Sequence, residues 1–129
     1  HNTYMPEEDI VWANEYAASN GLKLVYCLCI NANLYIENKT PPVDLFLKHN
    51  CHVVLGTDSY SSNWQLSIAK EMQALIQHTS LTQEQVLQMA ISNGAAALQW
   101  DDVLGSFDKG KKPGVVLVAN DFNSSLRMQ

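Results

Sequence analysis

The sequence predicts an α/β domain built around a parallel sheet. Two apolar runs, residues 22–30 and 52–56, have the near-continuous hydrophobicity of strands that are covered on both faces. Segments typical of helices precede and follow each run, and an alternation of buried strands with helices is typical of parallel sheets. Of the 129 residues, 47% are hydrophobic and 16% are charged, which is enough apolar material for a folded core.

A helix and a strand open the chain. Pro6 and the three acidic residues after it favour a helix start, because proline is tolerated in the first turn and acids there complement the helix dipole. The Asn-Gly pair at 20–21 favours the end of this helix. The first strand, residues 22–30, is expected to follow directly.

The middle of the chain predicts a loop, a short helix and the second strand. The polar segment 31–40 is expected to be a loop, and the Pro-Pro pair after it opens a helix over 43–49. The second strand, 52–56, stops at the polar cluster 57–59. The sequence contains no internal repeat and no low-complexity linker.

Two helices and a last strand complete the prediction. Capping-box spacings at 62–65 and 82–85 indicate two helix starts, and the second helix is expected to reach about residue 99. Residues 115–118 are expected to form a strand, and the polar tail 123–129 is expected to be frayed. Two or three strands make a narrow sheet with uncovered edges, so we expect part of the fold to lie outside this chain.

Composition argues against several classes of function. A net charge of -5 with 8 Lys and Arg residues and no basic cluster disfavours binding to nucleic acid or to a membrane surface. No apolar run approaches the roughly 20 residues of a membrane span. The odd set Cys27, Cys29 and Cys51 argues against a disulfide framework. We expect buried, reduced thiols and a cytoplasmic protein.

Polar residues after the two strands are the candidates for chemistry, because reactive groups gather at the carboxyl ends of parallel strands. Asp58 follows the second strand and is a candidate metal ligand or general base. The alternative is a structural aspartate that caps the next helix. His1 opens the chain without an initiator Met, so we expect a cut or processed N-terminus, and a terminal histidine alone indicates little.

Four segments also resemble motifs of a known family. They read CINANL, VLGTDS, LQMAISNGAAAL and LGSF, at residues 29–34, 54–59, 87–98 and 104–107. In this order they resemble the C-P-x-S-N-L, V-x-L-G-T-D, A-T-x-x-G-A-x-A-L and L-G-S-L motifs of metal-dependent amidohydrolases. The most similar branch contains the chlorohydrolases and the S-adenosylhomocysteine, guanine and cytosine deaminases. Ile30 and Ala32 depart from its proline and serine.

The resemblance implies a fold and roles for several residues. Residues 1–104 would be the C-terminal part of a (β/α)8 TIM barrel, from about strand 6 or 7 to strand 8, and residues 105–129 a return segment to a small β domain. Asp58 would ligate a divalent metal, zinc with iron or manganese as alternatives, and take a proton from the attacking water. His1 would position or polarise the substrate, and Asn33 and Ser59 would line the pocket.

The resemblance also implies an activity. The parent enzyme would hydrolyse a C–N or C–Cl bond of a nitrogen heterocycle through a metal-bound hydroxide. The family's H-x-H pair and a further histidine have no counterpart here, so we expect this chain alone to be inactive and to associate with the missing N-terminal part or with itself. The alternatives are a cyclic-amide hydrolase of the same superfamily and a non-catalytic α/β binding module, with Asp58 as phosphoacceptor or cap.

Overall fold

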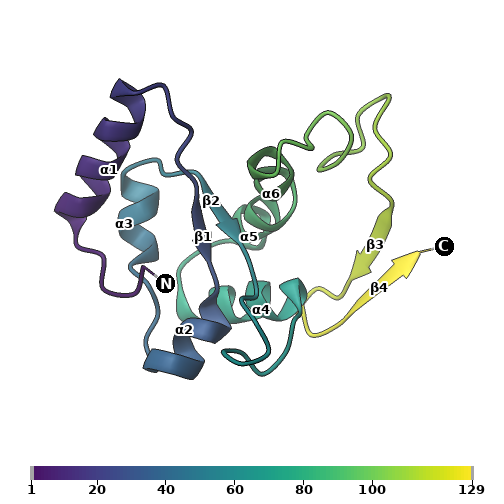
Figure 1. The fold of residues 1–129 in the computed structure, drawn as a ribbon. Helices are drawn as coiled ribbons and strands as arrows, with labels where there is room; N and C mark the ends of the chain where they lie inside the picture. Colours follow the sequence, from purple (N-terminus) through teal and green to yellow (C-terminus); the bar gives the residue numbers. More distant parts are fainter. Residues whose placement is uncertain (1, 129) are drawn as a thin grey trace.

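The chain is a short run of alternating helices and strands followed by a hairpin (Figure 1). The computed structural model describes residues 2–128. In chain order the elements are α1 Glu7–Ser19, β1 Tyr26–Leu28, α2 Ile30–Glu37, α3 Val43–Lys48, β2 Val53–Leu55, α4 Ile68–His78, α5 Gln83–Ala90, α6 Ser92–Ala97, β3 Val115–Val118 and β4 Ser125–Met128.

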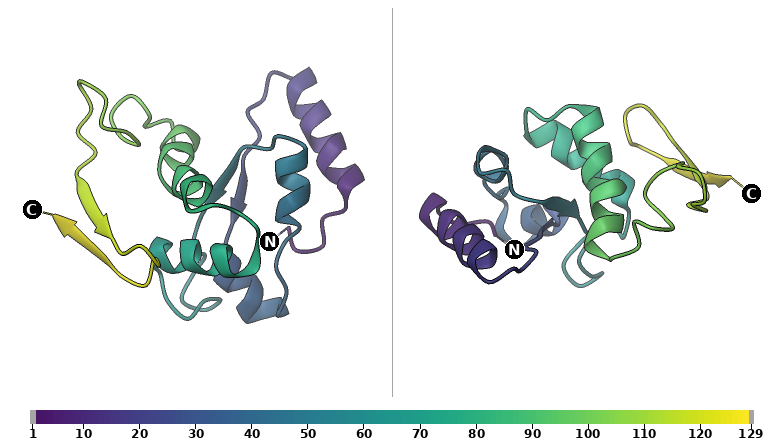
Figure 2. Two further views of the ribbon diagram at one scale, coloured as in Figure 1. Left: turned by 180° about the vertical axis from the view of Figure 1, so that it is seen from behind. Right: turned by 90° about the horizontal axis from the view of Figure 1, so that it is seen from above.

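The predicted parallel sheet is confirmed, with β1 and β2 paired in parallel and Cys27 opposite Val54. Helices α1 and α3 lie on one side of this pair, and α5 and α6 lie on the other (Figures 1 and 2). Tyr26 of β1 packs against Phe46 of α3 with ring centroids 4.8 Å apart. Tyr26, Leu28 and Val53 are buried, whereas Cys27 between the two β1 core residues is exposed, so the cover expected on both faces is present only in part.

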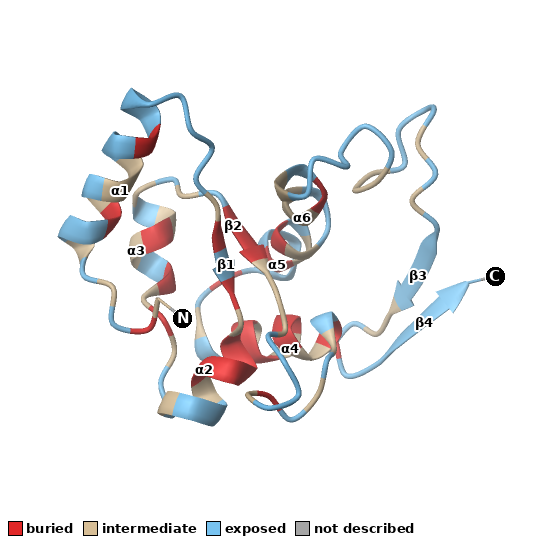
Figure 3. Ribbon diagram, in the orientation of Figure 1, coloured by how far each residue is buried: buried red, intermediate tan, exposed pale blue. Residues whose placement is uncertain are grey.

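The core lies between the strands and the helices α1 to α5 (Figure 3). Its fully buried side chains include Ile10, Leu28, Phe46, Leu75 and Val86. Among residues 2–128, no helix combines the length and apolar character that crossing a membrane requires.

The polar segment 31–40, expected to be a loop, forms most of helix α2 instead. The polar pattern gave a wrong prediction because two of these polar side chains, Asn31 and Asn33, are buried at 8% and 1% exposure rather than solvated. The Glu71 carboxylate of α4 accepts a hydrogen bond from the Asn31 N–H at 3.0 Å. A partner distant in the sequence therefore satisfies the first turn of α2, in place of a local cap.

The start of α4 also differs from the prediction. The helix begins at Ile68, and the Ser67 hydroxyl caps it by accepting from the Lys70 N–H. Ser62, expected to cap this helix, instead belongs to a turn with Ser59. The capping box at 82–85 is confirmed, because Thr82 and Gln85 each accept from the other's backbone N–H.

Two expectations about the second half need correction. The helix expected to run to about residue 99 is interrupted at Ile91, which separates α5 from α6. The tail expected to be frayed contains β4, which pairs antiparallel with β3, so β3 lies outside the parallel sheet. Alternating apolar side chains in a short polar tail are a weak signal for a strand, and the pairing partner decides the outcome.

Candidate functional site

Asp58 lies where the sequence placed it, three residues after the end of β2. Its side chain is exposed and its backbone has a φ of +58°. Aspartate visits this left-handed region more readily than most residues. The backbone N–H of Asp58 donates to the sulfur of Cys29, which follows β1. The turn at Asp58 is thus held against the end of the neighbouring strand.

The residues after Asp58 form a compact serine turn. The Ser59 hydroxyl lies 2.7 Å from that of Ser61 and 3.0 Å from that of Ser62, and the Ser62 hydroxyl donates to the Ser59 carbonyl. Ser59 is exposed beside Asp58, as a pocket-lining residue would be. Its hydroxyl is already engaged within the turn.

A buried carboxylate, Glu71, ties the ends of both strands together. Its side chain is 0% exposed. One oxygen accepts from the Asn31 backbone N–H at 3.0 Å, and the other accepts from the Asn31 and Asn63 side-chain amides at 3.0 and 2.8 Å. Asn63 also donates to the Thr57 carbonyl at 2.7 Å. This hydrogen-bonded chain runs from α2 through α4 to the residue before Asp58.

We call this set, Asn31, Thr57, Asn63 and Glu71, the carboxylate network. It fixes helix α2, which follows β1, relative to the loop after β2, because a buried polar group that loses its hydrogen-bond partner costs free energy. The sequence analysis did not select Glu71 as a site residue. The available signal was a charged residue at position 71 on the apolar side of α4, three residues after Ile68 and four before Leu75.

Asn33 lies in α2 and is buried, and its amide donates to the Thr3 hydroxyl at 2.6 Å. Thr3 in turn donates to the Glu37 carboxylate. The N-terminal segment is therefore held against the helix that follows β1. His1, the other residue expected to touch substrate, lies outside the described residues.

Cys27, within β1, and Cys29, just after it, both lie beside Gly56. A Cβ placed on Gly56 would lie 2.8 Å from the Cys27 sulfur and 3.3 Å from the Cys29 sulfur. A hydrogen bond from Cys29 lowers the pKa of Cys27 to about 7, and the same bond together with burial raises the pKa of Cys29. Cys27 is exposed and Cys29 and Cys51 are partly exposed, so the expectation of three buried thiols is wrong.

Whether these residues can hold a metal ion depends on which ligand atoms they supply and on how many ligands lie close together. Asp58 supplies a carboxylate, a usual ligand of zinc. Across residues 2–128, however, no three His, Cys, Asp or Glu side chains come close enough together to hold a metal ion. A catalytic zinc site uses about three protein ligands. The described residues could therefore supply one ligand to a metal ion, the Asp58 carboxylate.

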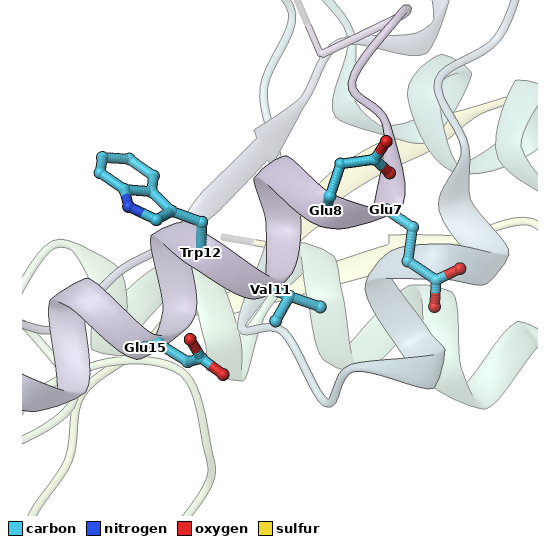
Figure 4. A pocket seen from close by; sticks show the side chains of 5 residues that line it. All are labelled: Glu7, Glu8, Val11, Trp12 and Glu15. Atoms are coloured by element: carbon cyan, nitrogen blue, oxygen red, sulfur yellow. The ribbon is translucent and has the colours of Figure 1, made fainter.

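A surface hollow on α1 is a separate feature. Figure 4 shows its lining, which comes entirely from that helix: Glu7, Glu8, Val11, Trp12 and Glu15. None of these residues follows a strand of the parallel sheet. The hollow is therefore no part of the strand-end site.

Two of the similar proteins of known name carry the same name. The chain is 33% identical to the 5-methylthioadenosine/S-adenosylhomocysteine deaminase of Thermoanaerobacter pseudethanolicus, over 94% of the chain and 28% of that protein. It is 35% identical to the protein of the same name from Caldicellulosiruptor saccharolyticus, over 95% of the chain and 29% of that protein. The chain thus spans less than a third of these curated relatives.

Solved structures contain the same arrangement. The crystal structure of an adenosine deaminase from Xanthomonas campestris with bound zinc matches with a TM-score of 0.73 and 25% identity, over 92% of this chain and 27% of that one. An amidohydrolase from Thermotoga maritima matches with a TM-score of 0.60 and 18% identity, over 90% of this chain and 37% of that one, which shows the fold alone.

The family assignment rests on nearly the whole sequence. Residues 1–128 match the profile of the Amidohydrolase family. The relatives that are at least 30% identical over most of the chain carry deaminase names. The mixed helix and strand order also agrees with the matched structures. This chain belongs to the amidohydrolase family, as the resemblance of its motifs indicated.

Proposed function

We propose that the protein containing this chain is a metal-dependent hydrolase that deaminates an amino-substituted nitrogen heterocycle, with Asp58 as a metal ligand and proton carrier. The observation that carries the proposal is the placement of Asp58. It follows a buried parallel strand, and its turn is held by Cys29 and by the carboxylate network. Family membership connects this placement with hydrolysis.

The fold supports a place for the chain in a larger barrel. A sheet of two parallel strands leaves edges that further strands would pair with. We assign residues 1–104 to the last part of a (β/α)8 barrel and residues 105–129 to a return segment toward a small β domain. In such a barrel the loops after the strands form the active site, which agrees with the position of Asp58.

Asp58 has two tasks in this proposal. As a metal ligand it would act with side chains from outside the described residues, since it brings one donor. A bound divalent metal, zinc or else iron or manganese, would lower the pKa of water toward about 7. The Asp58 carboxylate accepts the proton of the attacking water and delivers it to the leaving amine, which departs as ammonia.

The substrate side of the proposal draws on residues around Asp58. Ser59 is the exposed neighbour of Asp58, and Asn33 lies after the other strand, so both are candidates to line the pocket. His1 is proposed to orient the substrate or polarise the bond that breaks. The relatives are named for adenosine derivatives, which favours an aminopurine nucleoside over a chlorinated ring.

The deciding experiment compares Asp58→Asn with Asp102→Asn in the complete gene product. Asp102 is an exposed aspartate in the turn after α6, so it is a matched control. We expect Asp58→Asn to reduce ammonia release from an aminopurine nucleoside by about 10³-fold, within the range of general acid–base catalysis. Its metal content, measured by elemental analysis, should also fall. The control should retain both.

Two results would overturn the proposal. One is a complete gene product in which Asp58→Asn leaves turnover and metal content unchanged. The other is a wild-type protein that opens cyclic amides but releases no ammonia from any aminoheterocycle. In that case the site hydrolyses a different C–N bond, and the deaminase assignment is wrong.

A further inference from the structure

Asp58 has a backbone conformation that must be held in place. Its φ of +58° lies in the left-handed region, which side chains disfavour. Rotation of the peptide unit between residues 57 and 58 would return φ to an ordinary value, because the orientation of that unit sets φ of the residue after it. Such conformations persist where the surrounding contacts determine them, and they cluster at functional sites.

The peptide unit before Asp58 is held at both of its ends. Its carbonyl, that of Thr57, accepts a hydrogen bond from the Asn63 side-chain amide at 2.7 Å. Its N–H, that of Asp58, donates to the sulfur of Cys29. The C=O and N–H of a planar trans peptide unit point in opposite directions, so the two contacts together fix the unit against rotation.

The fold holds the two side chains that make these contacts. Asn63 is 3% exposed and also donates to Glu71 at 2.8 Å. The Cys29 sulfur lies 3.3 Å from the position that a Cβ on Gly56 would occupy, so the missing side chain leaves room for the sulfur. The Gly56 N–H donates to the Leu28 carbonyl at 2.9 Å. This bond keeps the chain after β2 beside the residue that carries the sulfur.

The peptide unit after Asp58 is also held at both ends, but by local contacts. Its carbonyl, that of Asp58, accepts from the Thr57 hydroxyl at 3.2 Å. Its N–H, that of Ser59, donates to the Ser62 hydroxyl at 3.3 Å. The first peptide unit sets φ of Asp58 and the second sets ψ. Together they determine the direction in which the Asp58 side chain leaves the backbone.

We propose that Asn63 and Cys29 are positioning residues, which hold the peptide unit before Asp58 and thereby place its carboxylate for binding the metal and carrying the proton. We call these two contacts the peptide clamp. The inference rests on the proposed function of Asp58. Neither side chain has to be reached from solvent, so packing by further strands of a barrel is compatible with this role.

The first test compares Cys29→Ala with Cys29→Ser in the complete gene product. Alanine removes the acceptor of the Asp58 N–H, whereas the serine hydroxyl is close in size to the thiol and accepts a hydrogen bond. We expect Cys29→Ala to lower kcat for ammonia release by about 10- to 100-fold, as for other outer partners of a metal ligand, and to change KM by less than about threefold. Cys29→Ser should restore most of the lost kcat.

Cys51→Ala is the matched control for loss of a hydrogen-bonded thiol. The Cys51 sulfur accepts from the Asn14 side-chain amide at 3.3 Å, and Cys51 lies before β2, at the end of the strand opposite Asp58. This variant should lose stability and keep the kcat and KM of the wild type. If it loses as much kcat as Cys29→Ala, both variants act through the stability of the fold, and the proposal is wrong.

Hydrogen exchange measures the peptide clamp without substrate. The Asp58 N–H should exchange faster in Cys29→Ala and in Asn63→Ala, because each variant frees one end of the peptide unit. Release of metal to a chelator should also become about 10-fold faster or more in both variants. Asn63→Ala also breaks the contact with Glu71, so the two Cys29 variants decide the test if Asn63→Ala does not fold. Unchanged exchange in Cys29→Ala overturns the proposal.

The double variant tests whether the two contacts act as one unit. Once one end of the peptide unit is free, the contact at the other end holds little. Cys29→Ala combined with Asn63→Ala should therefore lower kcat by about as much as the worse single variant. Losses that multiply would mean that the two residues act separately, which contradicts the peptide clamp.

Failure of this inference differs from failure of the proposed function. An Asp58→Asn protein that keeps its turnover and metal contradicts the proposed function, and exchange of the Asp58 N–H still reports whether the clamp holds the peptide unit. Faster exchange in Cys29→Ala with unchanged kcat and metal release contradicts the positioning role alone. In that case Asp58 keeps its assigned tasks and Cys29 contributes only to local structure.

Discussion

The strand-end site and the C-terminal hairpin differ in the kind of side chain that is buried around their short strands. At the ends of β1 and β2, polar side chains are buried, with Glu71 at 0%, Asn33 at 1% and Asn63 at 3% exposure. In the hairpin of β3 and β4, apolar side chains are exposed, with Leu117 at 61% and Leu126 at 64% (Figure 3).

The contrast shows what each region depends on. The site is held by hydrogen bonds that become costly to break once their groups are buried. The hairpin is held by four backbone pairs and by the loop between its strands, where Phe122 is 4% exposed in the core. An isolated two-stranded hairpin is marginally stable at best. We therefore expect that replacing a polar residue at the site lowers stability strongly. Replacing an apolar residue on the hairpin strands should lower it little.

Glu71→Ala should give the largest effect. It removes the acceptor of the Asn31 backbone N–H and of the Asn31 side-chain amide. Each buried donor left without a partner costs about 1–3 kcal/mol, so we expect a loss of about 3 kcal/mol in the free energy of unfolding. Chemical denaturation measures this loss. The exposed Glu15 of α1, changed to Ala, is the matched control and should change stability by less than about 0.5 kcal/mol.

Glu71→Gln separates the effect of the Glu71 hydrogen bonds from the effect of the size of its side chain. The side chain keeps its size, but its amide nitrogen cannot accept a hydrogen bond. If the network positions the Asp58 loop, this variant should lower metal retention and the rate of ammonia release while circular dichroism stays unchanged. A Glu71→Ala protein as stable as the control would show that the buried network contributes little, and the contrast between the two regions would fail.

The sequence was sufficient for the parts of the fold that local signals determine. The capping box at Thr82 and Gln85 and the helix end at Asn20 and Gly21 are contained within a few residues, and both were predicted correctly. Helix α2 was missed because its first turn is satisfied by Glu71, 40 residues away. A contact between residues so far apart in the sequence produces no local sequence pattern.

The site was predictable in part for the same reason. The placement of Asp58 after β2 follows from the strand rule, since a polar cluster interrupts an apolar run there. The carboxylate network combines residues from three separate segments, and only packing brings them together. The closeness of the Cys27 and Cys29 sulfurs to Gly56 likewise depends on the register of β1 against β2. Neither arrangement can be read from spacing alone.

Phe122→Ala should give an intermediate effect that is confined to the hairpin. Burying a phenylalanine side chain contributes about 1.5–3 kcal/mol, so its loss should release the loop from the core. Gln73 and Gln83 donate to the Asp121 and Asn120 carbonyls and would be left as the remaining polar contacts. Hydrogen exchange of the β3 and β4 amides should become faster, and exchange in β1 and β2 should not.

Leu117→Ala is the control within the same hairpin. Its side chain is 61% exposed, so truncation should change stability by less than about 0.5 kcal/mol. If this variant loses as much stability as Phe122→Ala, the exposed face of β3 is covered by another part of the protein. The comparison of the two regions would then need to include that covering surface.

Glu7→Gln should give the smallest effect and sharpen the contrast between buried and surface polar contacts. Glu7 joins α1 to α3 by accepting from Lys48 at 2.7 Å and contacting His49 at 2.6 Å, and its side chain is 40% exposed. Those hydrogen bonds, that from Lys48 first, hold the pKa of the Glu7 carboxyl below its ordinary value. Solvent screening keeps such surface pairs weak.

The lowered pKa fixes the sign of the pH dependence. A carboxyl whose pKa is lower in the folded state stabilises the fold above its unfolded pKa of about 4.3, and the contribution disappears as pH falls through the folded pKa. Unfolding midpoints of the wild type and Glu7→Gln should therefore differ slightly at pH 7 and converge below about pH 4. A gap that persists or widens in acid would mean that Glu7 acts through packing, because a charge contact cannot survive protonation of the carboxylate.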